Sequence, residues 1–173
     1  VNIDHIATLR NARGEAYPDP ARAAAVVVAA GADQVTCHPR LDQRHIRFSD
    51  LEALRRASPV LNFEMAAVDF MLEHALALMP DWACIVPETR EEITTEGGLD
   101  TSLASLPPIV EALQRAGIKV SLFIDPELRA VRDSVDLGVD AVELHTGAYA
   151  QAGGGEVAQE LERLRCATAL GVE

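Results

Sequence analysis

Short runs of apolar, mostly β-branched residues alternate with longer segments of helical periodicity along the whole chain. Three of the helical segments end at Gly31, Gly117 and Gly138, each followed by two turn residues and a new apolar run, as left-handed helix caps would be. Alternation of this kind is typical of a parallel α/β sheet. The pattern predicts six strands, at residues 1–5, 34–38, 60–65, 82–87, 120–125 and 141–147.

The length of the chain suggests a barrel with units missing. A closed eight-unit barrel takes about 250 residues, so residues 1–173 would form a single domain covering about six βα units of a TIM (β/α)8 barrel. A doubly wound sheet is the alternative, but it usually has a glycine-rich phosphate turn, and no GxGxxG occurs. Because the chain opens directly in a strand-like run and stops where a seventh strand should begin, we expect truncation at both ends.

Composition narrows the class of protein. A formal net charge of -12 argues against a nucleic-acid or anionic-membrane surface. The apolar runs are too short to span a bilayer, and no signal-peptide pattern opens the chain, so we expect a cytoplasmic protein that does not bind membranes. The cysteines Cys37, Cys84 and Cys166 are odd in number and far apart, which favours reduced thiols packed in the core.

Polar residues recur on one face of the predicted strands. Because side chains alternate along a strand, residues of one parity share a face, and the barrel's active site lies where strands end. The polar pairs are Asn2 with Asp4, Thr36 with His38, Asn62 with Glu64, Ser121 with Asp125, and Glu143 with His145. Each pair alone could simply cap a loop, but five together predict an enzyme. Acid-base work would fall to His38, Glu64 and Glu143, with His5 or His145 as further candidates.

Cations gather at the end of the second predicted strand and just after it, within residues 34–46. Arginines beside His38 and His45 would oppose a bound dication, so we expect no metal site. Arg40 and the two histidines instead suit an oxyanion such as phosphate. Arg44 fits this site or a solvated surface equally well.

Two further observations concern charge. Arg10 and Arg13, expected in the loop after the first strand, would add to the field that attracts a phosphate. Lys119 is the only lysine and lies at the start of its strand, opposite the expected site, which disfavours Schiff-base chemistry.

Several longer runs carry a resemblance. The segments VNIDHIATLRNARG, VTCHPRLDQRHI, LNFEMA, IVPETREEITTEGGLD and VELHTGAYA, in this order, closely resemble the pyridoxine 5'-phosphate synthase family of the deoxyxylulose-dependent vitamin B6 pathway. The resemblance implies a TIM-barrel enzyme that condenses 3-amino-2-oxopropyl phosphate with 1-deoxy-D-xylulose 5-phosphate. This reaction would release phosphate and water as the pyridine ring closes. The resemblance also implies a homo-octamer and no metal or organic cofactor.

The resemblance assigns roles to individual residues of this sequence. His38 and Glu64 match proton acceptors, and Glu143 matches a carboxylate that stabilises a transition state. The residues that match substrate contacts are Asn2, Asp4, His5, Arg13, Arg40, His45 and Thr94.

Two departures from the family pattern qualify these roles. The more familiar form of the second segment reads HLREDRRHI, where this chain has HPRLDQRHI, which should alter the loop shape. The family's proton-donating histidine lies on a seventh strand, which this sequence does not include. Alternatives are therefore another phosphate-binding barrel enzyme acting on sugar phosphates, or an inactive truncated barrel that serves only as a binding module.

Overall fold

The structure is a computed structural model and describes residues 1–88 and 97–172. Five parallel strands form one sheet, and their order in the sheet is their order in the sequence. They are β1 (Val35–Cys37), β2 (Leu61–Met65), β3 (Trp82–Ile85), β4 (Lys119–Ile124) and β5 (Ala141–Leu144). A doubly wound sheet would reverse its order at a switch point. The unbroken order confirms the TIM-barrel class.

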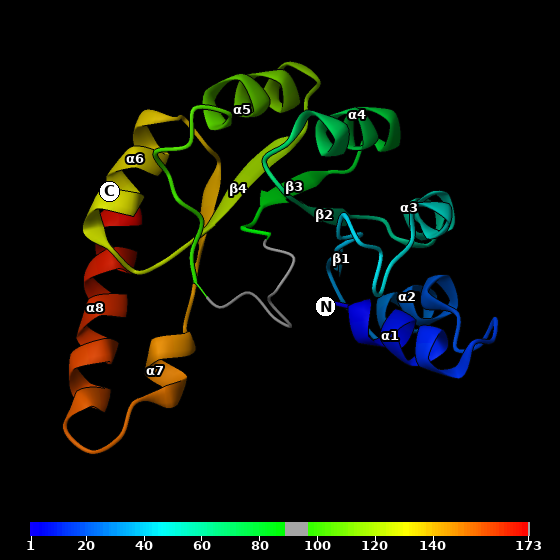
Figure 1. Ribbon diagram of the computed structural model, residues 1–173, viewed down its shortest axis with the longest axis horizontal. Coiled ribbons are helices and arrows are strands. Elements are labelled where there is room, and N and C mark those ends of the chain that lie inside the picture. The colour runs from blue at the N-terminus through cyan, green and yellow to red at the C-terminus, as the bar shows by residue number, and fades with distance from the viewer. Residues whose placement is uncertain (89–96, 173) are drawn as a thin grey trace.

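Helices lie along the outer side of the curved sheet, which forms an open arc (Figure 1). The described helices are α1 (Asp4–Arg13), α2 (Pro20–Ala29), the 3-10 helix η1 (Phe48–Asp50), α3 (Leu51–Ala57), α4 (Asp69–Leu78), α5 (Leu106–Arg115), α6 (Leu128–Asp136), α7 (Gly147–Gln151) and α8 (Glu156–Gly171). Within residues 1–88 and 97–172, every helix is too short or too polar to span a bilayer.

The two faces of each strand differ as the alternation predicts. On the outer face, Val120, Leu122 and Ile124 of β4 are fully buried, and so are the corresponding residues of β2. Burying such side chains contributes about 1.5 to 3 kcal/mol each. The inner face carries the polar residues, so the strands present their chemistry toward the inside of the arc.

Glycines end three helical segments as predicted. Gly31, Gly117 and Gly138 have φ values of 100°, 81° and 70°, in the left-handed region. Only glycine adopts this conformation without steric cost.

The prediction of a strand at residues 1–5 is wrong. Asn2 forms only an isolated parallel bridge to Thr36, and α1 begins at Asp4. The cause is local: the Asn2 side-chain oxygen accepts the Asp4 N–H at 2.8 Å, which turns the chain into the helix. Arg10 and Arg13 therefore lie on α1, not in a loop.

The cysteine prediction holds for two of the three residues. Cys37 and Cys84 are buried in the sheet, whereas Cys166 is exposed on α8 and does not pack in the core.

Candidate active site

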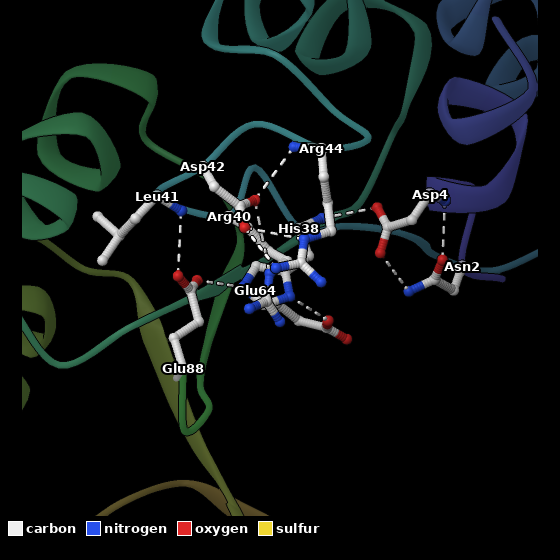
Figure 2. Close-up of polar contacts among 9 residues, drawn as sticks. All are labelled: Asn2, Asp4, His38, Arg40, Leu41, Asp42, Arg44, Glu64 and Glu88. Carbon is white, nitrogen blue, oxygen red and sulfur yellow. Dashed lines mark hydrogen bonds and ion pairs between the residues drawn. The ribbon is translucent and has the colours of Figure 1, made fainter. Parts of the chain in front are cut away.

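Asp4 links the start of α1 to the end of β1. The Asn2 amide donates to Asp4 Oδ2 at 2.9 Å, and Asp4 Oδ1 accepts the backbone N–H of His38 at 2.8 Å (Figure 2). Asp4 is 6% exposed. This buried carboxylate fixes the point at which the chain leaves β1 and enters the cationic segment, which contains His38, Arg40, Arg44 and His45.

The imidazole of His38 lies between two carboxylates. Its Nε2 is 2.6 Å from Glu88 Oε1, and its Nδ1 is 3.5 Å from Glu64 Oε2. His38 follows β1, Glu64 belongs to the neighbouring strand β2, and Glu88 follows β3 (Figure 2). Three consecutive strands thus bring these groups to one point, as the ends of parallel strands in a barrel do.

The environment of Glu64 favours its protonated form. Burial raises the pKa of Glu64 to about 7, and the charges of Asp4 and Glu143 act in the same direction, against the opposing effect of His38. A carboxyl group with this pKa can accept or release a proton near neutral pH, which suits general acid-base work.

Glu143 lies across the inner face, on β5. Its Oε2 is 4.0 Å from the thiol of Cys84 on β3, and burial raises the pKa of Glu143. Burial also raises the pKa of Cys84 to about 12, so this thiol stays protonated. Glu143 is exposed, whereas His38 is buried and Glu64 is half-buried, and the charge of Glu143 acts on Glu64.

Side chains of α1 hold the cationic segment after β1 in place. The buried guanidinium of Arg10 pairs with Asp50 at 2.7 Å and donates to the His45 carbonyl oxygen at 3.2 Å. The Asn11 amide donates to the same carbonyl at 2.8 Å. Arg10 therefore holds the loop that carries His45, with its charge paired to Asp50.

Arg40 and His45 belong to the same cationic segment. Arg40 is 4% exposed, with Nε 3.7 Å from Asp42 Oδ1. The rings of His38 and His45 are 5.8 Å apart. Burial lowers the pKa of His45, and its buried Nδ1 has no hydrogen-bond partner among the described residues. The charge of Arg40 also acts on His45, and a guanidinium at this place can bind a phosphate oxygen.

Comparisons with known proteins decide the family. The sequence pattern of the family described as Pyridoxal phosphate biosynthesis protein PdxJ matches residues 1–173. This chain belongs to that family. Pyridoxine 5'-phosphate synthase of Gluconobacter oxydans is 55% identical over 169 residues, which cover 96% of this chain and 71% of the relative. The synthase of Rhodospirillum rubrum is 52% identical over 182 residues, covering 100% of this chain and 73% of the relative.

Solved structures support the fold alone. Mandelate oxidase bound to 3,3-difluoro-2-hydroxy-3-phenylpropionic acid superposes with a TM-score of 0.59 at 16% identity, covering 88% of this chain and 55% of that one. The carboxyl transferase domain of Rhizobium etli pyruvate carboxylase gives a TM-score of 0.50 at 16% identity, over 76% of this chain and 25% of that one.

The remaining predicted site residues of this PdxJ-family chain lie on α1, in the segment after β1, at the end of β5 and outside the described residues. His5 and Arg13 are exposed on α1, and Arg44 pairs with Asp42 at 2.6 Å on the surface. Thr94 lies outside the described residues. His145 forms a separate pair, with Nδ1 3.1 Å from Asp125 Oδ1.

Residues 97–99 lie close to the backbone at the end of β4. The Leu99 N–H donates to the Phe123 carbonyl at 2.8 Å, beside the end of β4. A Cβ atom added to Gly98 would lie 2.0 Å from the Asp125 nitrogen, so only glycine fits there. Gly98 and Leu99 thus lie beside the end of β4.

Sequence reasoning missed Glu88 in the PdxJ-family motif IVPE. Cys84, Val86 and Glu88 share one parity, so extending the face rule beyond the end of β3 would have indicated it.

Proposed function

We propose that the protein is a pyridoxine 5'-phosphate synthase that condenses 3-amino-2-oxopropyl phosphate with 1-deoxy-D-xylulose 5-phosphate. The product is pyridoxine 5'-phosphate, and phosphate and water are released. The observation that carries the proposal is the buried His38 imidazole, 2.6 Å from Glu88 and 3.5 Å from Glu64, in a chain of the PdxJ family.

Ring closure needs several proton transfers. Imine formation, dehydration and cyclisation each move protons between carbon, nitrogen and oxygen, and positioned side chains accelerate such steps. Glu64, with a pKa of about 7, exchanges protons with the substrates and with His38. Glu143 supplies a further carboxyl group from the far side of the inner face and stabilises positive charge as it develops.

Phosphate recognition falls to the segment after β1 and to the start of the chain. Arg40 and His45 would bind the deoxyxylulose phosphate through charge-assisted hydrogen bonds. Asp4 and His5 would contact the same substrate, while Asn2 and Arg13 would contact the amino ketone. Thr94 is proposed as a further substrate contact.

We also propose the domain, the oligomeric state and the cellular compartment in which the reaction takes place. Residues 1–173 would belong to one TIM-barrel domain, of which they cover about six βα units, within a cytoplasmic homo-octamer that needs no metal ion or organic cofactor. Sedimentation velocity tests the octamer. Full turnover after treatment with a chelator is expected, and loss of turnover that zinc or magnesium restores would contradict the absence of a metal.

Product formation tests the function directly. The protein is incubated with both substrates, and pyridoxine 5'-phosphate is measured by liquid chromatography and mass spectrometry. We expect product and inorganic phosphate only when both substrates are present. Binding of deoxyxylulose phosphate without product would instead favour another sugar-phosphate enzyme.

A further inference from the structure

Glu88 makes two hydrogen bonds from one buried carboxylate. Its Oε1 is 2.6 Å from His38 Nε2, and its Oε2 accepts the backbone N–H of Leu41 at 3.0 Å (Figure 2). The side chain is 4% exposed. One carboxylate therefore holds both the imidazole and the backbone turn that follows it.

We propose that Glu88 is a positioning residue that keeps a proton on His38 Nε2 and turns His38 Nδ1 toward Glu64 for proton exchange. The inference rests on the proposed function, because it concerns the proton transfers of that reaction. An ionised carboxylate can only accept a hydrogen bond, so in this contact Nε2 is the donor. The other ring nitrogen is then the one that can exchange a proton with Glu64.

The two carboxylates around His38 have opposite electrostatic environments. Burial alone would raise the pKa of Glu88, but the hydrogen bonds from His38 and the Leu41 N–H, with the charge of Arg40, bring it below its ordinary value. The pKa of Glu64 is raised to about 7, chiefly by burial. Such a separation distinguishes a group that stays ionised from one that exchanges protons.

A role confined to holding Leu41 would predict a different outcome for Glu88→Gln. The glutamine oxygen can still accept the Leu41 N–H, so the turn is kept. Its amide then faces His38 Nε2 with a donor, which forces the imidazole proton onto Nδ1. The substitution therefore changes the tautomer while preserving the loop.

The test combines kinetics with nitrogen NMR on the whole protein. For Glu88→Gln we expect kcat to fall roughly 10²- to 10⁴-fold, the range for lost acid-base catalysis, with KM within about twofold of wild type. The matched control is Glu52→Gln, at an exposed residue of α3, which should keep wild-type kinetics. Imidazole ¹⁵N spectra, assigned by the signals absent in His38→Ala, should show the proton on Nε2 in wild type and on Nδ1 in Glu88→Gln.

Two results would overturn the proposal. One is a wild-type kcat in Glu88→Gln, and the other is a wild-type His38 that carries its neutral-state proton on Nδ1. The second readout needs no turnover and no variant at Glu88. Absence of product in wild type would contradict the proposed function, while the spectra would still decide the role of Glu88.

Discussion

The carboxylate of Asp4 accepts the backbone N–H of His38 at 2.8 Å, joining the first turn of α1 to the end of β1. Both residues are buried, so water cannot replace this hydrogen bond. The position of His38 therefore depends on a residue 34 positions earlier in the chain.

Replacing Asp4 by alanine should lower stability and turnover together. The buried His38 N–H would lose its acceptor, which costs about 1 to 3 kcal/mol in the free energy of unfolding. Urea denaturation measures this loss. The control is Asp33→Ala at an exposed position, expected to stay within about 0.5 kcal/mol of wild type. Equal stability of the two variants would show that the Asp4 contact contributes nothing.

Replacing Arg10 by methionine should lower the free energy of unfolding more than replacing Asp4 by alanine does. The substitution leaves Asp50 without its buried partner and removes a donor from the His45 carbonyl, and breaking a buried ion pair costs about 3 to 5 kcal/mol. Thermal unfolding followed by circular dichroism measures the change. Arg56→Met, which removes an exposed ion pair with Glu52, should cost at most about 1 kcal/mol. Similar melting temperatures for both variants would refute the structural role of Arg10.

Alanine at Gly98 should displace the segment beside β4. Its Cβ would meet the Asp125 nitrogen at 2.0 Å, so the backbone must shift, at a typical cost of about 1 to 3 kcal/mol. KM for the substrates of the proposed reaction should rise, because Gly98 and Leu99 lie beside the end of β4, at the edge of the sheet that carries the candidate site. Gly153→Ala, where no atom lies within 4 Å of the added Cβ, is the control and should behave as wild type.

Much of the fold follows from local sequence pattern. For a strand with one fully apolar face, such as β4, the sequence pattern predicts both the residues of the strand and the face that is buried, because burial of that face contributes most to its stability. The prediction of the first strand was wrong because the Asn2 side chain accepts a hydrogen bond from the Asp4 N–H, which competes with strand pairing. The alternation of apolar residues does not predict such a side-chain contact.

The site was only partly predictable for a different reason. The face rule placed His38, Glu64 and Glu143 on one side of the sheet, because that rule depends only on strand parity. The contact of Arg10 with Asp50 spans 40 positions and depends on how α1 packs against the loop, which no local pattern encodes. Glu88 lies beyond the last residue of β3, outside the range to which strand parity applies directly.

The raised pKa of Glu64 gives a pH dependence of stability. The folded protein keeps the Glu64 proton up to about pH 7, whereas the unfolded chain loses it near the ordinary value of 4.5. Ionisation of the unfolded state therefore lowers stability as the pH rises between these values. Glu64→Gln cannot ionise, so its stability relative to wild type should grow by on the order of 2 to 3 kcal/mol from pH 4.5 to pH 8. Urea denaturation across this range checks it, and a constant difference would contradict the raised pKa.

The most direct test of the account is the rate of pyridoxine 5'-phosphate formation by His38→Gln and Glu64→Gln. If these two residues move the protons, kcat should fall roughly 10²- to 10⁴-fold in each variant, while both variants remain folded by circular dichroism. Wild-type turnover in both variants would contradict the claim that the His38 and Glu64 pair carries out the chemistry.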